Sequence, residues 1–492
     1  MDLTKYTDAN KSSSVIASFT KDQLNAYTHL IDFINRGFDE NDYRRALIGS
    51  AGTGKTYMIK EVINKCNLSN STIGLAAPTH KAARVLSNST NIKTSTIASD
   101  LGFRLNTDLE DFDINNPPFD PLGEKKIKGY RLYIIDEASM IGRSLKTYIE
   151  KECKENGCMI IYMGDSSQLP PVKETISPCL RGIKYYELNQ IVRQEEDNPV
   201  SYLLKLLRYD IQHKTWKFLE HINANRFKFD LSESKGYYTC GLNEFQSLVI
   251  DGFNNEEFTT NVDTCRLVAY TNKAVSDWNK FIRTNIIQDS DRAALTRNDL
   301  ILSYVTLVNE FNEAVITNSE DYIIKNIANF TNKDGIKGFT VKFVKINGGE
   351  STKPLFVVDH NDRANILLYY KLCNELIDAA KSAPASSRRA RWKLYYEFKE
   401  RNLLLANILD KYGKIKFYRD LDYGFAITSH KAQGSTFKDV YVDINDIVFM
   451  ANGSPYGDID NTLRRLYTAC SRCKNRLFLC CLLYTSDAAD EL

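Results

Sequence analysis

Residues 49–56 read GSAGTGKT, which follows the pattern GxxxxGK[ST] of a phosphate-binding loop. Glycines at this spacing let backbone N–H groups approach phosphate oxygens, because no side chain stands in the way. Lys55 is expected to reach the β and γ phosphates of a nucleotide, and Thr56 to hold Mg²⁺. The pattern therefore predicts a nucleotide site built from Gly49, Ala51, Gly52, Thr53, Gly54, Lys55 and Thr56.

Two further segments carry side chains suited to nucleotide hydrolysis. In IIDEAS, residues 134–139, Asp136 is predicted to hold Mg²⁺ and Glu137 to orient or deprotonate an attacking water. In GDSSQLPPV, residues 164–172, Gln168 is predicted to sense the γ phosphate and couple it to movement. The phosphate-binding loop upstream favours a catalytic role for the acidic pair over a surface role.

Short apolar runs precede each of these segments. The runs span residues 44–50, 72–78, 130–137 and 158–165, and helical patterns at residues 57–67 and 81–87 lie between them. Continuous apolar strands that alternate with helices predict an α/β fold with a parallel sheet buried on both faces. Because ligands of such sheets bind at the carboxyl ends of the strands, the predicted site residues should meet there.

A second α/β unit is predicted further along the chain. It begins with CRLVAYTN at 265–272 and resumes at 423–430 and 437–444. Between these parts, FTVKFVKI (339–346), an NGGE turn and KPLFVVDH (353–360) have the pattern of a β-hairpin, which predicts a β-rich insertion. A basic and aromatic segment follows at 382–402.

The composition is that of a soluble globular protein, with 43% hydrophobic and 26% charged residues and a net charge of +2. Any nucleic-acid contact must therefore come from local basic stripes. No apolar run suggests a membrane span, and the polar N-terminus lacks the apolar core of a signal peptide, so a cytoplasmic protein of a bacterial or phage-infected cell is expected. The eleven cysteines, including the Cys470–Cys473 pair, are interpreted as reduced thiols rather than zinc ligands.

The order of the motifs resembles that of superfamily 1 DNA helicases of the RecD-like, phage Dda-like branch. The matching strings run across nearly the whole chain: FTKDQ (19–23), GSAGTGKT (49–56), AAPTHKAA (76–83), STIAS (95–99), IIDEAS (134–139), GDSSQLPP (164–171), LNQIVRQ (188–194), YGFAITSHKAQGSTF (423–437) and LYTACSR (466–472). Two strings depart from the family pattern. Ala98 replaces a histidine, and Cys470 and Ser471 replace the more usual Val and Thr.

The resemblance implies roles for individual residues. Gln23 would read adenine, and Gln433 and Gly434 would also contact the nucleotide. Arg193 and Arg472 would be arginine fingers that reach the γ phosphate from across a cleft. The implied contacts to single-stranded DNA are Pro78, Thr79, His80, Lys81, Thr96, Thr428, Ser429, His430 and Lys431. The hydroxyl and imidazole groups of Thr79, His80, Thr428, Ser429 and His430 suit phosphate contacts without base reading, so little sequence specificity is expected.

The implied fold is two RecA-like P-loop domains, with a small pin insertion in the first and a β-barrel-like insertion in the second. Phe112 and Phe119 are candidates for a pin that stacks on a DNA fork, although both could instead pack against their own domain. Arg388, Arg389, Arg391, Trp392 and Lys393 could contact DNA or form a solvated helix face.

The expected domain limits follow from the motif positions. They are a polar tail (1–18), the first RecA-like domain (19–191, with the pin insertion at 99–129), the first part of the second domain (192–288), a β-rich barrel and basic helical insertion (289–419), and the second part of the second domain (420–480). Residues 481–492, CLLYTSDAADEL, resemble a translated sequencing adapter, so this segment is expected to be a non-native tail.

The expected function is an ATP-dependent, Mg²⁺-dependent DNA helicase that moves 5′ to 3′ on single-stranded DNA in replication, recombination or repair. Expected partners are single-stranded and fork DNA and a single-strand-binding protein or polymerase, with the chain acting as a monomer. Four alternatives stay open at this point: a motor of opposite polarity, an ATPase switch for partner proteins, a passive single-strand-binding module, and an RNA track.

Overall fold

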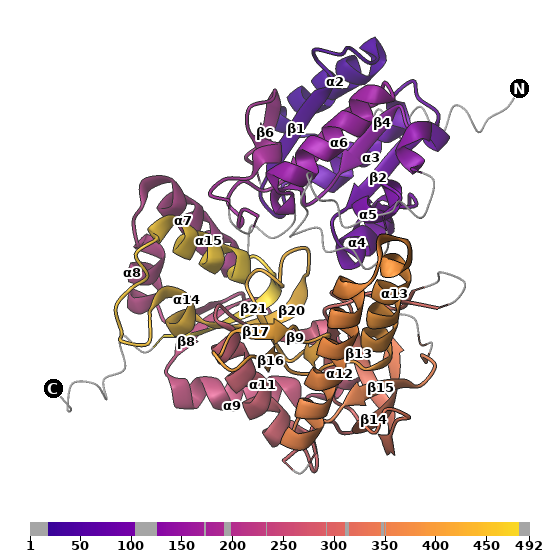
Figure 1. Ribbon diagram of the computed structural model, residues 1–492. Helices are drawn as coiled ribbons and strands as arrows, with labels where there is room; N and C mark the ends of the chain where they lie inside the picture. The colour runs from indigo at the N-terminus through magenta and orange to yellow at the C-terminus, as the bar shows by residue number, and fades with distance from the viewer. Residues whose placement is uncertain are drawn as a thin grey trace, which may run out of the picture. The chain divides into compact units, whose positions relative to one another are not determined.

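The computed structural model describes most of the chain (Figure 1). The described residues are 18–103, 125–171, 174–190, 198–232, 234–291, 293–309, 314–345, 349 and 351–481. Contacts divide the chain into a first unit (1–240, 432–436 and 444–492) and a second unit (241–431 and 437–443). The pin candidates Phe112 and Phe119, the expected finger Arg193 and the tail 482–492 lie outside the described residues.

A six-stranded parallel sheet carries the nucleotide motifs in the first unit, with the order β3-β2-β4-β5-β1-β6. Its strands are β1 (Arg44–Gly49), β2 (Ile73–Ala77), β3 (Ser95–Thr96), β4 (Leu132–Ile135), β5 (Met159–Gly164) and β6 (Tyr185–Leu188). The four predicted strands are thus confirmed as β1, β2, β4 and β5. The edge strands β3 and β6 are additional to them.

Helices cover both faces of this sheet (Figure 1). They are α2 (Lys21–Arg36), α3 (Lys55–Lys65), α4 (His80–Thr90), α5 (Ile97–Asp100) and α6 (Arg143–Glu155). Alternate residues of β1 point to opposite faces: Leu47 packs in a core with Ile59 of α3, whereas Ile48 packs in a core with Ile149 of α6. Because both faces are buried, the central strands β2, β4 and β5 are apolar throughout.

Short 3₁₀ helices connect some of these elements. They are η1 (Asn70–Thr72), η2 (Lys126–Gly129), η3 (Ala138–Met140) and η4 (Pro178–Leu180) in the first unit, and η5 (Val262–Thr264) in the second.

A second six-stranded sheet has the order β19-β9-β20-β21-β8-β7. Its strands are β7 (Phe227–Phe229), β8 (Gly236–Cys240), β9 (Cys265–Ala269), β19 (Ala426–Thr428), β20 (Phe437–Asp443) and β21 (Cys473–Cys480). This sheet confirms the predicted second α/β unit, so the chain has a fold with two RecA-like sheets.

The remaining helices of the two α/β parts are α7 (Pro199–His213), α8 (Lys217–Ala224), α14 (Ile444–Val448) and α15 (Ile459–Cys470) in the first unit, and α9 (Leu242–Phe253), α10 (Glu256–Thr260) and α11 (Asn272–Ile286) in the second. Helices α7 and α15 pack against each other, and their contacts place them in the same unit as the nucleotide motifs. The domain limits expected from the sequence therefore differ from the contact-based division, and they stay a prediction.

The predicted β-rich insertion is present in the second unit. Its antiparallel sheet has the order β15-β14-β13-β10-β18, which leaves β15 and β18 at the two edges, so the described strands form an open sheet rather than a closed barrel. The strands are β10 (Leu300–Ser303), β13 (Asp321–Thr331), β14 (Lys337–Lys345), β15 (Leu355–Val358) and β18 (Leu421–Tyr423), with two small hairpins of β11 (Leu307–Val308) and β12 (Ala314–Ile316), and β16 (Ile408–Leu409) and β17 (Ile415–Phe417).

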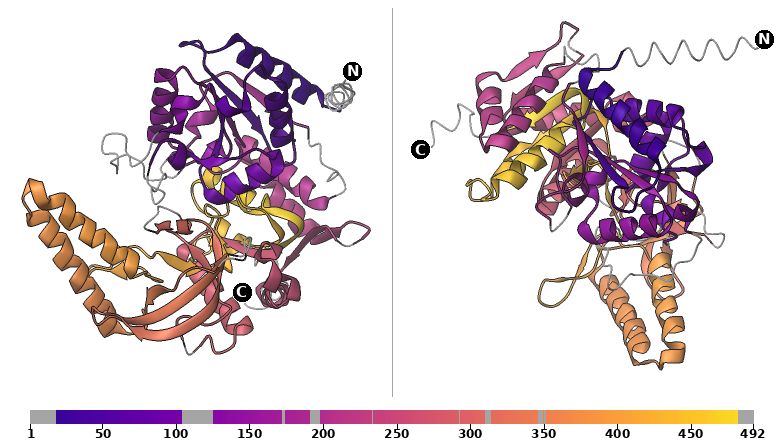
Figure 2. Two further views of the ribbon diagram at one scale, coloured as in Figure 1. Left: turned by 90° about the vertical axis from the view of Figure 1, so that its right-hand side faces the viewer. Right: turned by 90° about the horizontal axis from the view of Figure 1, so that it is seen from above.

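Two long helices lie between β15 and β18 in the chain, α12 (Arg363–Ser382) and α13 (Ala385–Arg401). Figure 2 shows them side by side as a helical hairpin next to the long curved strands β13 and β14. The sequence predicted a basic helix at the position of α13 but gave no separate prediction for α12. None of the helices in the described part of the chain combines the length and apolar character that a membrane crossing requires.

Candidate active site

The loop between β1 and α3 has the backbone geometry that its glycines allow. Gly52 and Gly54 have φ angles of 83° and 78°, a left-handed conformation that side chains other than glycine rarely adopt. The Lys55 ammonium donates to the backbone oxygens of Gly49 (2.6 Å) and Ser50 (3.1 Å). Lys55 therefore folds back over the loop, with its charge at the centre of the predicted phosphate site.

Gln23 lies directly against this loop. It forms a capping box with Thr20 at the start of α2, and its Nε2 donates to the Thr53 backbone oxygen over 2.9 Å. A Cβ on Gly54 would approach Gln23 Nε2 to 2.6 Å, so any other residue here would displace the end of the Gln23 side chain, and the φ angle favours glycine independently. The structure thus connects Gln23 to the phosphate loop, and its adenine-reading role stays a prediction.

Asp136 and Glu137 follow β4 and are partly buried. The Glu137 N–H donates to Asp136 Oδ1 over 2.9 Å, and Glu137 has a left-handed φ of 51°, which turns the chain sharply after the strand. Burial raises the pKa of both carboxyls, and the positive charge of Lys55 opposes that rise at each of them. The acidic pair and the loop lysine therefore share one electrostatic environment.

The oxygen atoms here suit Mg²⁺. The Thr56 hydroxyl at the start of α3 and the Asp136 carboxylate are hard oxygen donors, the kind that Mg²⁺ prefers, often together with phosphate oxygens and water. Over the described ranges, no three His, Cys, Asp or Glu side chains cluster as a protein-only metal site. Burial also raises the pKa of the Cys470 thiol, which disfavours the thiolate that zinc would need.

The Gln168 loop (Asp165–Leu169) is held by α15 and by Gln433, all within the first unit. Tyr467 donates its hydroxyl to Asp165 Oδ2 over 2.7 Å, and Thr468 Oγ1 accepts from the Leu169 N–H over 3.1 Å. Gln433 Nε2 donates to the Leu169 oxygen over 3.0 Å, and Arg464 donates to the Ser166 oxygen. Gln168 itself is buried, and its Oε1 has no partner among the described residues.

Arg472 and Gly434 lie close to the acidic pair. The Arg472 guanidinium is buried and donates to the Ser435 oxygen over 3.2 Å, and its charge opposes the rise that burial causes in the pKa of Glu137. A Cβ on Gly434 would stand 4.0 Å from Glu137 Cγ and 3.2 Å from Ala82 Cβ. The structure therefore brings Arg472, Gly434 and Glu137 together, while their roles in hydrolysis stay a prediction.

The predicted DNA contacts in the first unit lie at helix starts. Thr79 Oγ1 caps α4 by accepting from the Ala82 N–H (3.2 Å), and Thr96 Oγ1 caps α5 by accepting from the Ser99 N–H (3.3 Å). Pro78 and His80 are partly exposed, whereas Lys81 is largely buried. The exposed helix start after β2 is the part that a backbone phosphate could reach.

The predicted DNA contacts in the second unit follow β19. Ser429 is fully buried, and its hydroxyl donates to the Ala269 oxygen (3.2 Å), so it supports the loop from inside rather than presenting a donor to DNA. Thr428 Oγ1 accepts from the Lys431 N–H (3.2 Å), while His430 is partly exposed. Lys431 donates to Asn318 Oδ1 (3.1 Å).

The Lys431 ammonium nitrogen lies 4.6 Å from the centre of the Tyr304 ring. No motif had pointed to Tyr304 or Asn318, because they come from a part of the chain over a hundred residues away from Lys431. Tyr467 and Thr468 were also unassigned, although they lie inside the string LYTACSR, which was their only available signal.

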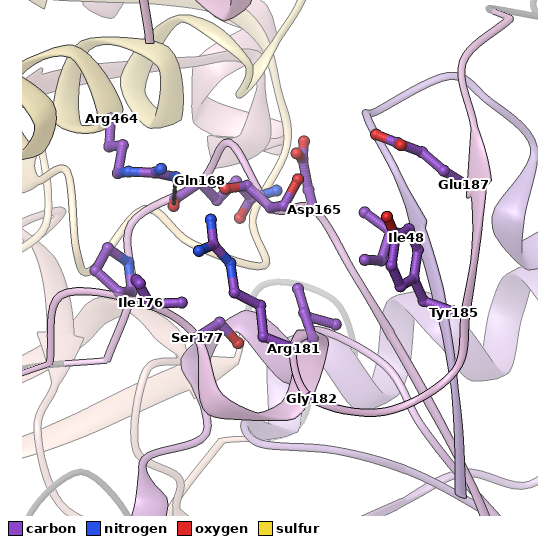
Figure 3. A pocket seen from close by; sticks show the side chains of 13 residues that line it. Ile48, Asp165, Gln168, Ile176, Ser177, Arg181, Gly182, Tyr185, Glu187 and Arg464 are labelled. Carbon is purple, nitrogen blue, oxygen red and sulfur yellow. Dashed lines mark hydrogen bonds between the residues drawn. The ribbon is translucent and has the colours of Figure 1, made fainter. Parts of the chain in front are cut away.

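A cavity of about 370 Å³ lies beside the Gln168 loop. It is bounded by Ile48 of β1, by Glu187 of β6 and by residues 176–182. Figure 3 shows the Arg181 side chain directed from that segment toward Gln168 and Asp165, and Arg464 hydrogen-bonded to the loop. Arg181 lies outside every motif, so no sequence pattern had indicated it.

Comparisons with known proteins agree with these motifs. A family model described as an AAA domain matches residues 22–224, and one described as a UvrD-like helicase C-terminal domain matches residues 423–480. An uncharacterized protein of Acanthamoeba polyphaga mimivirus is 26% identical over 93% of this chain and 98% of its own length.

Two named relatives match over less of their length. The ATP-dependent DNA helicase dda of Enterobacteria phage T4 is 25% identical over 59% of this chain and 61% of its own length. The ATP-dependent RecD2 DNA helicase of Deinococcus radiodurans is 32% identical over 31% of this chain and 20% of its own. Together with the ordered motifs and the two RecA-like sheets, these matches show that the chain belongs to the superfamily 1 helicases of the RecD-like, Dda-like branch.

Proposed function

We propose that this protein hydrolyses ATP to move 5′ to 3′ along single-stranded DNA and separate duplex strands ahead of it. One observation carries the proposal: the Gln168 loop is hydrogen-bonded to α15 and Gln433, while Arg472 lies in electrostatic range of Glu137. A nucleotide-dependent movement of the loop would therefore be passed directly to α15. A kinase would not need that mechanical connection.

In this proposal each polar group has a defined task. Lys55 neutralises charge on the β and γ phosphates, and Glu137 takes a proton from the attacking water. Arg472 adds positive charge as the γ phosphate leaves, and Gln168 reports its presence to the loop. Mg²⁺, held by Thr56 and Asp136, would supply charge neutralisation for the leaving phosphates. Arg193, from the string LNQIVRQ, is proposed as a second finger.

DNA is proposed as the track because two named relatives are DNA helicases. Thr79 and His80 in the first unit, and Thr428, His430 and Lys431 in the second, are proposed to contact phosphates. Ser429 and Thr96 are proposed as positioning residues, because their hydroxyls are used inside the protein. Contacts of this kind do not read base edges, so binding should depend little on sequence.

The direction of movement and the pathway rest on the family resemblance. We infer 5′ to 3′ movement, a role in replication, recombination or repair, and action as a monomer alongside a single-strand-binding protein or polymerase. The cytoplasm of a bacterial or phage-infected cell is the proposed location.

The decisive experiment is unwinding of partial duplexes with either a 5′ or a 3′ single-stranded tail, in the presence of Mg²⁺ and ATP. The proposal expects unwinding from the 5′ tail only, and none with the Lys55→Ala variant or without ATP. Unwinding from the 3′ tail only would refute the polarity and keep the motor. ATP hydrolysis that single-stranded DNA does not stimulate would refute the motor and favour a switch for partner proteins.

A further inference from the structure

Helix α13 carries an unusually one-sided charge. Arg388, Arg389, Arg391 and Lys393 lie within six positions and are exposed, and no acidic residue occurs between Ala385 and Tyr396. The first acidic residue, Glu397, lies 3.8 Å from Lys393 in an exposed ion pair that stabilises little. This half of the helix therefore carries four cations and no carboxylate before Glu397.

These cations are not needed for packing. α13 packs against α12 in a core formed with Tyr369 and Cys373, yet Phe398 is the buried residue that α13 contributes. Arg388 has a local role as well, because it donates to the Ala383 oxygen at the end of α12 over 3.3 Å. Arg391 forms no hydrogen bond or ion pair with the described residues. A stable helix could therefore carry neutral residues at these positions.

Aromatic rings lie among the same cations. The Trp392 ring packs edge-on against Tyr395 (5.7 Å between centroids), and Tyr395 packs edge-on against Tyr396 (5.3 Å). Tyr396 is still 53% exposed. Its ring is held by its neighbours at the surface, with area available to stack on a flat partner.

The spacing matches a short run of nucleotides. Trp392 and Lys393 lie three and four residues after Arg389, and Tyr396 lies four and three residues after them, so the four side chains share a helix face. With a rise of about 1.5 Å per residue, Arg389 and Tyr396 are about 10 Å apart along the axis, roughly three nucleotides of one strand at about 3.4 Å each. Arg389, Lys393 and Tyr396 are all exposed on this face.

We propose that α13 is a second contact surface for single-stranded nucleic acid, in which arginine and lysine bind backbone phosphates and Tyr396 stacks on an unpaired base. The charge selects a polyanion, and the exposed ring selects unpaired bases over a duplex, whose bases already stack on one another. The inference rests on the proposed function only in that the same chain binds single-stranded DNA elsewhere.

The test uses the full chain and fluorescein-labelled oligothymidine, with binding followed by anisotropy across a salt series. The charge variant is Arg389→Gln/Lys393→Gln, which removes the two cations on the face that carries Tyr396. Two lost contacts at about 0.7 each should lower the slope of log affinity against log salt by about 1.4, so wild type loses roughly 7-fold more affinity than the variant between about 50 and 200 mM salt. The matched control, Lys280→Gln/Lys411→Gln, removes equal charge from exposed positions outside α13 and should keep the wild-type slope.

The ring is tested separately. Tyr396→Ala should weaken binding at least about fivefold, whereas Tyr396→Phe, which keeps the stacking surface, should bind like wild type. Loss of duplex binding in the charge variant, with no effect of Tyr396→Ala on either DNA, would overturn the single-strand assignment in favour of a duplex contact. An unchanged salt slope in the charge variant would overturn the proposal as a whole.

DNA-stimulated ATP hydrolysis separates the two proposals. Suppose that DNA stimulates ATP hydrolysis by the wild type, and that the charge variant has the wild-type slope of log affinity against log salt. The α13 inference then fails and the motor stands. If DNA does not stimulate ATP hydrolysis by the wild type, but the α13 substitutions lower its affinity for oligothymidine, the motor fails and the contact surface stands.

Discussion

The hydrogen bond between Tyr467 and Asp165 offers the sharpest test of how the nucleotide site is connected to α15. Both side chains are buried, and their oxygens are 2.7 Å apart. Burial, and then the Asp165 carboxylate, raise the pKa of Tyr467, so the phenol keeps its proton and donates it to the carboxylate. Tyr467→Phe removes the hydroxyl and little else.

The expected magnitude follows from the chemistry of that bond. A buried hydrogen bond to a charged group contributes about 1.5–3 kcal/mol, which is roughly a 10- to 150-fold change in an equilibrium constant. Among the described residues, the Asp165 carboxylate would then keep the bond from the Ser167 N–H (2.9 Å). The opening of α15 from the loop should therefore become more favourable by about that factor in Tyr467→Phe.

Hydrogen–deuterium exchange of the α15 amides measures this opening locally, which suits a protein that need not unfold in one step. Combining Tyr467→Phe with Asp165→Asn in a double-mutant cycle isolates the energy of the pair. The same variants should show a lower DNA-stimulated hydrolysis rate, because the loop no longer passes its movement to α15.

A change in α15 protection below about threefold would refute the reasoning, since it would mean that the bond contributes almost nothing. Tyr43→Phe is the matched control. Tyr43 also donates a hydroxyl from a buried ring, but to the Glu150 backbone oxygen over a long 3.4 Å. That control should leave α15 exchange unchanged.

Three further outcomes are expected. Lys55→Ala should lower the ATP hydrolysis rate by about 10²-fold or more, because a preorganised charge at the phosphates is lost, while single-strand binding without nucleotide persists; loss of both would contradict this role. Gly54→Ala should cost more stability in thermal unfolding than Gly37→Ala, since both have φ near 80° but only the Gly54 position has Gln23 Nε2 within 2.6 Å; equal losses would contradict the contact. Burial raises the pKa of Asp422 to about 6. The folded state then holds this proton more tightly than the unfolded chain, so unfolding free energy should fall by up to about 3 kcal/mol as pH rises from about 4 to 6 and stay level above, and Asp422→Asn should lack that fall in urea titrations.

The strands of the nucleotide-binding sheet were predictable because of their burial. A parallel strand covered on both faces has few polar positions, so Met159–Gly164 and the part of Arg44–Gly49 after its two arginines stand out as continuous apolar runs. The edge strands β3 and β6 escaped prediction because β3 has two residues and β6 alternates exposed Tyr185 and Glu187 with buried positions. Short or half-exposed strands leave a weaker pattern.

The site was predictable where chemistry demands particular residues at short spacing. Gly54, Lys55, Asp136 and Glu137 lie within two compact motifs, and the structure brings their charges together. Arg464 could not be found this way, because its partner oxygens on the Gln168 loop are about three hundred residues earlier in the chain. A single sequence carries no signal for such a pair.

Ser429 and Tyr304 show the same difference between what a motif indicates and what the packing decides. Ser429 looks from its motif like a phosphate donor, but the structure buries it and directs its hydroxyl to Ala269. Tyr304 has no motif at all, yet its ring lies beside the Lys431 ammonium. The residue type determines which bonds a side chain can form, whereas the packing around it determines which bonds it does form.

The sequence by itself determined the family, the phosphate loop and the acidic pair, because backbone conformation and phosphate chemistry restrict those positions to few residue types. Only the tertiary structure decided that Gln23 touches the phosphate loop, that α15 holds the Gln168 loop, and that the insertion is an open sheet beside a helical hairpin. Those features depend on contacts between distant segments, which many different residues can make, so local sequence patterns do not encode them.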